Sequence, residues 1–227
     1  MLEPFGPSLY VANGPVVSFF GFPYPTRMAV ACLSDGSVWA WSPIALTRAL
    51  ADEVQSLGPV RYIVSPNKLH HLFLHEWARQ WPEARLYAPP GLARRQPALH
   101  FSAELGDQPN AAWQADIDQV VFRGSFAMAE VAFFHRASRT AIMGDLIQRF
   151  PETEVSGWKG MVMRLGGLVG ESGSTPPDWR ASFLQRRPAR AALQKVLQWN
   201  PERLLIAHGT CVQTGAAGVI QKALSWI

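Results

Sequence analysis

Cysteine is scarce in this sequence. The 227 residues include two, Cys32 and Cys211, which lie far apart and in no C-x-x-C pair. A framework of several disulfides is therefore excluded, and the sparse cysteines suit a reducing compartment. Charged residues are also few, at 17%, against 48% hydrophobic residues. That balance excludes a disordered chain and supplies enough apolar side chains for a large core.

The sequence also lacks segments that favour a membrane or a nucleic acid. No apolar run reaches the length of a bilayer span, and the first seven residues, M-L-E-P-F-G-P, do not begin a signal peptide. The net charge of +4 is spread along the chain, without the dense basic stripe of a nucleic-acid groove. We therefore expect a cytoplasmic protein that binds a small molecule, with no membrane or nucleic-acid partner. Its oligomeric state is left open.

The length suits one large domain, so residues 1–227 are predicted to form a single domain. The first forty residues are rich in β-prone runs. Residues 13–15, Asn-Gly-Pro, are predicted to separate two strands, and residues 34–36, Ser-Asp-Gly, to turn a hairpin. Helical and strand-like patterns alternate over residues 46–88, and more strands are predicted within residues 119–143. This order predicts an α/β protein with mixed sheets.

Two segments show no regular pattern. Residues 89–116 contain several prolines and are predicted to be irregular. Residues 151–180 are rich in glycine and proline, and are predicted to form a long loop with a short helix. We expect this loop, with Trp158, Arg164 and Trp179, to cover a cleft.

Metal-binding residue types follow three of the predicted strands. They are His70 and His71 after the first strand, Asp145 after the second and His208 after the third. Active sites of layered α/β folds gather beyond strand ends, and imidazole and carboxylate are usual ligands of zinc, iron and manganese. From the residues alone, a shared metal site and separate roles in capping or turns both stay open.

The order of these motifs resembles the metallo-β-lactamase-like superfamily, whose fold is a four-layer αββα sandwich with mixed sheets. The family's first motif, T-H-x-H-x-D-H, matches S-P-N-K-L-H-H at residues 65–71, and its G-H-T-P-G-S element matches residues 125–130. Its last histidine matches His208. The similarity runs over most of the chain and is strongest to a bacterial branch known as a domain of unknown function.

The resemblance implies that one of the family's two metal sites is lost. The three histidines of the first site are replaced here by Pro66, Lys68 and Phe126. The positions of the second site hold His70, in place of an aspartate, with His71, Asp145 and His208. All four can bind metal, so the resemblance predicts one divalent ion, zinc in the first place, with iron or manganese as alternatives.

The predicted function is a mononuclear metal-dependent hydrolase, or a related metalloenzyme, that acts on an unknown small molecule. Asp145 and Lys68 are the predicted catalytic residues. Lys68 stands at a position of the lost metal, where its ammonium group would stabilise an oxyanion, or else it reaches solvent. His70 is expected to be the weakest ligand, because an imidazole replaces the family's carboxylate there. Its release would leave His71, Asp145 and His208 with an open coordination position for water.

The alternative function is a non-catalytic protein of the same fold that binds a ligand, with a structural metal or none. A third hypothesis is redox chemistry at a mononuclear iron. Glu130 has two interpretations, either as a hydrogen-bond partner of a metal-binding histidine or as a glutamate at a strand start or on the surface.

Overall fold

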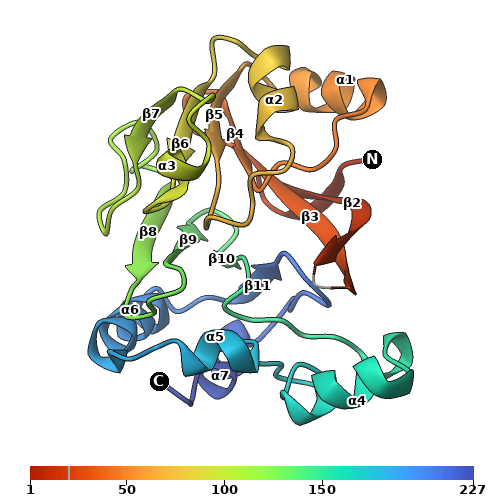
Figure 1. Ribbon diagram of the computed structural model, residues 1–227. Helices are drawn as coiled ribbons and strands as arrows, with labels where there is room; N and C mark the ends of the chain where they lie inside the picture. The colour runs from red at the N-terminus through yellow and green to blue at the C-terminus, as the bar shows by residue number, and fades with distance from the viewer. Residues whose placement is uncertain (20) are drawn as a thin grey trace.

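The computed structural model describes residues 1–19 and 21–227, and consists of two β-sheets that pack face to face (Figure 1). The first sheet contains, in spatial order, β1 (Glu3–Gly6), β2 (Leu9–Phe19), β3 (Phe22–Cys32), β4 (Val38–Trp41), β5 (Val60–Val64), β6 (Arg85–Ala88) and β7 (Phe101–Glu104). Strands β1 to β4 pair antiparallel, and β4 to β7 pair parallel. Parallel neighbours need crossover connections, which here contain α1 (Arg48–Ser56), α2 (Leu74–Gln80) and α3 (Leu92–Arg95).

The second sheet has the order β11-β10-β9-β8. Its strands are β8 (Ile117–Phe122), β9 (Glu130–His135), β10 (Thr140–Met143) and β11 (Arg203–Ile206). The first three pair antiparallel, and β11 joins β10 in parallel. The long connection from β10 to β11 contains the 3₁₀ helix η1 (Glu152–Glu154), α4 (Gly157–Leu165), α5 (Pro177–Ala181) and α6 (Arg186–Gln198), and α7 (Ala216–Ala223) ends the chain.

Apolar side chains form three layers around these sheets. Trp39, Trp41 and Phe133 are fully buried in the layer between the sheets. Helices α1 and α2 bury their apolar faces on the outside of the first sheet, and α6 and α7 bury theirs on the outside of the second. Because each sheet hides one face against the other and one against helices, the predicted four-layer αββα sandwich with mixed sheets is confirmed.

The hairpin at residues 34–36 is confirmed, with Gly36 at φ +81° between β3 and β4. The break predicted at residues 13–15 is wrong. These residues lie inside β2, where Asn13 pairs with Arg27 and Val16 with Pro25, so two residues of β2 oppose one of β3. A β-bulge absorbs the extra residue, and the strand continues through it.

The irregular segment predicted at residues 89–116 contains α3 and β7. Strand β7 pairs only with β6 and alternates between half-buried and exposed residues, so its sequence lacks the long apolar run of an internal strand. Residues 151–180 contain η1, α4 and most of α5, more helix than predicted. Of the three residues expected to cover a cleft, Trp179 lines the pocket that also contains His70, Asp145 and His208. Trp158 and Arg164 are not among the described residues that line it. No helix within the described residues is long and apolar enough to cross a membrane.

Candidate metal centre

The loop that carries His70 follows β5 and consists of turns, and α2 begins only at Leu74. Side chains of the loop shape it. The Ser65 hydroxyl lies 2.8 Å from the carbonyl oxygens of both Asn67 and His70. The Asn67 side-chain oxygen accepts a hydrogen bond from the Leu69 N–H at 2.9 Å, as in an Asx turn. His70 is therefore placed by a compact loop and not by the start of a helix.

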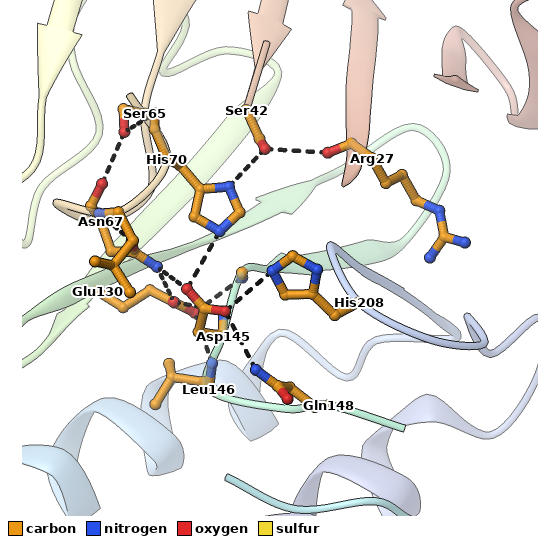
Figure 2. Close-up of polar contacts among 12 residues, drawn as sticks. Arg27, Ser42, Ser65, Asn67, His70, Glu130, Asp145, Leu146, Gln148 and His208 are labelled. Atoms are coloured by element: carbon orange, nitrogen blue, oxygen red, sulfur yellow. Dashed lines mark hydrogen bonds and ion pairs between the residues drawn. The ribbon is translucent and has the colours of Figure 1, made fainter. Parts of the chain in front are cut away.

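Three of the predicted metal ligands meet at one point (Figure 2). His70 Nε2 lies 3.2 Å from Asp145 Oδ2, and His208 Nε2 lies 3.1 Å from Asp145 Oδ1. One candidate ligand atom from each residue lies within 4.8 Å of the other two. Asp145 follows β10 and His208 follows β11, so the parallel pairing of these strands brings both residues to the same edge of the second sheet.

The tautomer of His208 follows from its backbone contact. His208 Nδ1 lies 2.7 Å from the Pro25 carbonyl oxygen. A carbonyl oxygen only accepts hydrogen bonds, so Nδ1 carries the proton. In the neutral ring, Nε2 then presents a lone pair toward Asp145. Histidines that bind metals usually donate their other ring N–H in this way.

A serine determines the tautomer of His70 in the same manner. His70 Nδ1 lies 2.7 Å from Ser42 Oγ, and the Ser42 hydroxyl donates its proton to the Arg27 carbonyl at 3.0 Å. Ser42 Oγ must therefore accept from His70 Nδ1, which leaves the Nε2 lone pair of the neutral ring facing Asp145.

The Asp145 carboxylate and the Nε2 lone pairs of His70 and His208 are all acceptors that face one another. Positive charge must lie between them to offset their mutual repulsion. The Asp145 carboxylate offers no proton, and the two neutral rings direct lone pairs at it. In a tetrahedral zinc site with bonds of about 2.0–2.1 Å, neighbouring ligand atoms are about 3.4 Å apart. Each ring nitrogen lies near that distance from one oxygen of the carboxylate, His208 Nε2 at 3.1 Å from Oδ1 and His70 Nε2 at 3.2 Å from Oδ2. Two imidazoles and a carboxylate at this spacing fit a divalent metal ion.

Where no metal is bound, a proton on the His208 ring would supply positive charge. Burial alone would raise the pKa of the Asp145 carboxyl, but the His208 and His70 rings outweigh burial and hold that pKa well below its usual range. For His208, burial lowers the pKa, whereas Asp145 raises it more strongly, so the pKa is raised. The site is therefore built around an ionised carboxylate.

Glu130 fixes the position of Asp145 through hydrogen bonds to the backbone around it. It is fully buried at the start of β9 and accepts hydrogen bonds from the backbone N–H groups of Gly144, Asp145 and Leu146 at 2.7–3.2 Å. The Asn67 side-chain amide donates to Glu130 at 2.7 Å and to Asp145 Oδ2 at 2.8 Å. Burial and the Asp145 charge raise the pKa of Glu130 to about 7, and these donors oppose that rise. Glu130 thus positions Asp145 and forms no hydrogen bond with a histidine of the described part of the chain, which corrects the suggested histidine partnership.

His71 lies outside the cluster of His70, Asp145 and His208, although it was expected to be a better metal ligand than His70. Its Nδ1 lies 3.0 Å from Gln96 Nε2. Burial and the Arg95 guanidinium lower the pKa of His71, so this ring stays neutral. Adjacent residues of a turn direct their side chains differently, and here it is His70 that points inward.

A pocket of about 690 Å³ opens beside His70, Asp145 and His208. Its apolar lining includes Leu69, Leu72, Phe126, Met128 and Trp179. Lys68, half-buried, lines the same pocket and has no carboxylate partner among the residues that the structure describes. Lys68 therefore lies where a bound molecule would meet it.

Sequence analysis overlooked Ser42, Asn67 and Gln148. Ser42 directly follows β4, so its place beyond a strand end was a usable signal. It was missed because serine is not a usual metal ligand. Asn67 and Gln148 have no such signal, because only the folded chain brings them to Asp145.

The comparisons agree with this architecture. The sequence matches the family described as Domain of unknown function (DUF4336) over residues 17–159. No curated protein matches it significantly in sequence. Among solved structures, the DIM-1 metallo-β-lactamase exposed to ceftazidime superposes with a TM-score of 0.66 at 13% identity, covering 98% of this chain and 95% of its own.

Two further metallo-β-lactamases superpose similarly. The enzyme from Pontibacter korlensis has a TM-score of 0.64 at 11% identity, covering 100% of this chain and 97% of its own. FIM-1 from Pseudomonas aeruginosa, in its mono-zinc form, has a TM-score of 0.61 at 11% identity, covering 98% and 95%. Identities this low show a shared fold alone. The chain belongs to the DUF4336 family and has the fold of the metallo-β-lactamases.

Proposed function

We propose that this protein is a mononuclear metal-dependent hydrolase of a small molecule, with zinc held by His70, Asp145 and His208. One observation carries the proposal. The Nδ1 atoms of both rings donate to fixed acceptors, so both Nε2 lone pairs converge on one carboxylate. Three protein ligands are typical of catalytic zinc, whereas structural zinc has four.

A divalent ion held by these residues would supply a Lewis acid that polarises a carbonyl oxygen and would lower the pKa of its bound water to about 7. Residues of the chain would position the ion and stabilise the charge that develops on the substrate. Asp145 would hold the ion, and its own position is fixed by hydrogen bonds with Glu130 and Asn67. Lys68 binds the developing oxyanion from its unpaired place in the pocket.

The pocket favours a substrate with an apolar body. Leu72 and Phe126 line it with 56% and 76% of their surface exposed, so a bound apolar group would cover them. The positions of the family's first metal hold Pro66, Lys68 and Phe126, which supports a single ion. The sparse cysteines support a cytoplasmic location.

Elemental analysis of protein purified without added metal tests the proposal. We expect one equivalent of zinc in the wild type and in His71→Ala, and little in His70→Ala and His208→Ala. Protein that neither retains nor takes up zinc, iron or manganese would contradict it.

A second measurement separates catalysis from binding. Metal-loaded protein is assayed on chromogenic esters, thioesters and lactams with apolar acyl groups, with Lys68→Met as a variant. We expect hydrolysis that requires metal and slows at least about tenfold in Lys68→Met. Bound metal without hydrolysis of any of these substrates would favour a non-catalytic ligand-binding protein.

A further inference from the structure

Gln148 is a buried amide beside the candidate metal centre. It is 2% exposed, and its backbone exchanges two hydrogen bonds with Ser174, at 2.9 and 3.1 Å. Figure 2 shows its side chain directed toward Asp145, next to His208. Its Nε2 lies 3.3 Å from Asp145 Oδ1, the oxygen that His208 also approaches. The backbone contacts therefore hold this amide against the ligand group.

The other end of the amide is unsatisfied. Gln148 Oε1 is buried and has no hydrogen-bond partner among the residues that the structure describes. An unpaired buried acceptor destabilises the folded state, and most buried polar atoms in native proteins are paired. The amide oxygen has two lone pairs, and in this orientation neither of them accepts a hydrogen bond.

A divalent ion reverses the preferred orientation. The two ends of an amide are nearly equal in size, and their partners determine which end faces where. Beside Asp145 alone, the NH₂ end is favoured. Beside Asp145 and a doubly charged cation, the negative oxygen end is favoured, and a half turn of the amide places Oε1 where Nε2 now lies.

That position is at ligand distance. Neighbouring ligand atoms of tetrahedral zinc are separated by about 3.4 Å when the bonds are 2.0–2.1 Å long. The 3.3 Å from Asp145 Oδ1 to the Gln148 amide is close to this value, as is the 3.1 Å from the same oxygen to His208 Nε2. The amide therefore lies at the spacing expected between two ligand atoms of one ion.

We infer that Gln148 is a fourth protein ligand of the metal, through Oε1 after this half turn. The inference rests on the proposed function, since it concerns the same ion. Zinc also accepts five ligands, so a fourth protein ligand leaves the pocket side open to substrate. The amide is neutral, so it adds a ligand atom without reducing the charge of the ion.

Zinc affinities measured by competition with a chromogenic chelator test this inference. Gln148→Leu is expected to weaken zinc binding at least tenfold, and Gln148→Glu, which keeps an oxygen ligand, is expected to bind at least as tightly as the wild type. Gln119→Leu is the matched control, because Gln119 is equally buried (1% exposed) but bonds Gly106 and Trp113 far from the ligands. Its zinc affinity should not change.

Two further readouts separate ligation from a structural role. Cobalt-substituted Gln148→Leu should show altered visible d–d bands. The melting temperature of the metal-free Gln148→Leu variant should not fall, because the substitution removes an unsatisfied oxygen. If Gln148→Leu does not fold, Gln148→Asn, which withdraws the amide by one methylene, carries the same expectation. Zinc bound equally by wild type and Gln148→Leu, with unchanged cobalt bands, overturns this inference alone. A wild type that binds no metal overturns both proposals.

Discussion

At the scale of single residues, Ser42 has the most unusual backbone near the site. Its φ is +52°, in the left-handed region that non-glycine residues rarely occupy. It directly follows β4, and its hydroxyl links His70 Nδ1 to the Arg27 carbonyl. Strain of this kind is kept where the surrounding structure requires a particular side-chain position. Here that requirement is the orientation of the His70 ring.

Removing this hydroxyl should weaken metal binding. In Ser42→Ala, the His70 ring loses its fixed tautomer, and zinc affinity is expected to fall about 10–100-fold, the usual effect of losing an outer hydrogen-bond partner. Ser37→Ala is the control, since both serines are 4% exposed and the Ser37 hydroxyl donates to Asp35, away from the site. Chelator competition measures the affinity. Equal zinc affinities in the two variants would show that Ser42 does not orient the ring.

His135 governs acid sensitivity away from the site. Burial lowers its pKa to about 4, with a smaller opposing effect from Asp116. Between pH 6.5 and 4 the unfolded chain therefore takes up a proton that the folded chain does not, so stability falls as the pH falls through this window, by up to about 3 kcal/mol. Urea unfolding of wild type and His135→Gln at pH 7 and pH 4.5 measures the difference. The exposed His100→Gln should retain the full acid loss.

At the scale of elements, the end of β11 determines where His208 lies. The Arg149 carbonyl accepts a hydrogen bond from the Thr210 N–H at 2.7 Å, and the Arg27 guanidinium donates to the Gly209 carbonyl at 2.7 Å. Gly209 has φ +94°, and a Cβ there would overlap the Arg149 backbone. The connection after β10 and the end of β11 are thus in direct backbone contact beside the ligands.

Gly209→Ala should separate these two segments. We expect a loss of at least about 2 kcal/mol in unfolding free energy, together with weaker zinc binding. Gly218→Ala, at an exposed α7 position where a Cβ meets nothing within 4 Å, should instead stabilise by about 0.5–1 kcal/mol. Chemical denaturation measures both. Changes of the same sign in the two variants would refute the close approach at Gly209.

At the scale of the whole molecule, Glu130 and Asn67 join the two sheets beneath the site. Glu130 begins β9 of the second sheet, and Asn67 lies in the loop after β5 of the first. They form an isolated β-bridge, and the Val131 N–H donates to the Pro66 carbonyl at 2.8 Å. Asp145 is bonded to both Glu130 and Asn67, so ligand geometry and sheet packing depend on the same contacts.

Glu130→Gln should therefore destabilise the fold. The substituted NH₂ group would face backbone N–H donors that now bond a carboxylate, at a cost of about 3 kcal/mol in unfolding free energy. The exposed Glu154→Gln serves as the control and should change stability by less than about 0.5 kcal/mol. Thermal and urea unfolding measure both. A Glu130→Gln variant as stable as the control would mean that Glu130 is protonated in the folded state.

Much of this architecture is predictable from the sequence because it depends on local patterns. The alternating β-prone runs, the Asp-Gly hairpin and the residues beyond strand ends predicted the sheets and placed His70, Asp145 and His208 near a common edge. The bulge in β2 and the edge strand β7 were missed, since a bulge is defined only by its partner strand and an exposed edge needs no apolar run.

The sequence by itself determined which positions carry groups able to bind metal, since that depends on residue type and on distance from a strand end. Only the tertiary structure decided which of two adjacent histidines faces Asp145. The choice depends on the turn that Ser65 and Asn67 shape. The Nε2 lone pairs face inward because of Pro25 and Ser42, which lie 183 and 28 residues away from their histidines along the chain. Contacts at such separations leave no periodic signal in the sequence, so only the fold shows which candidate ligands lie together.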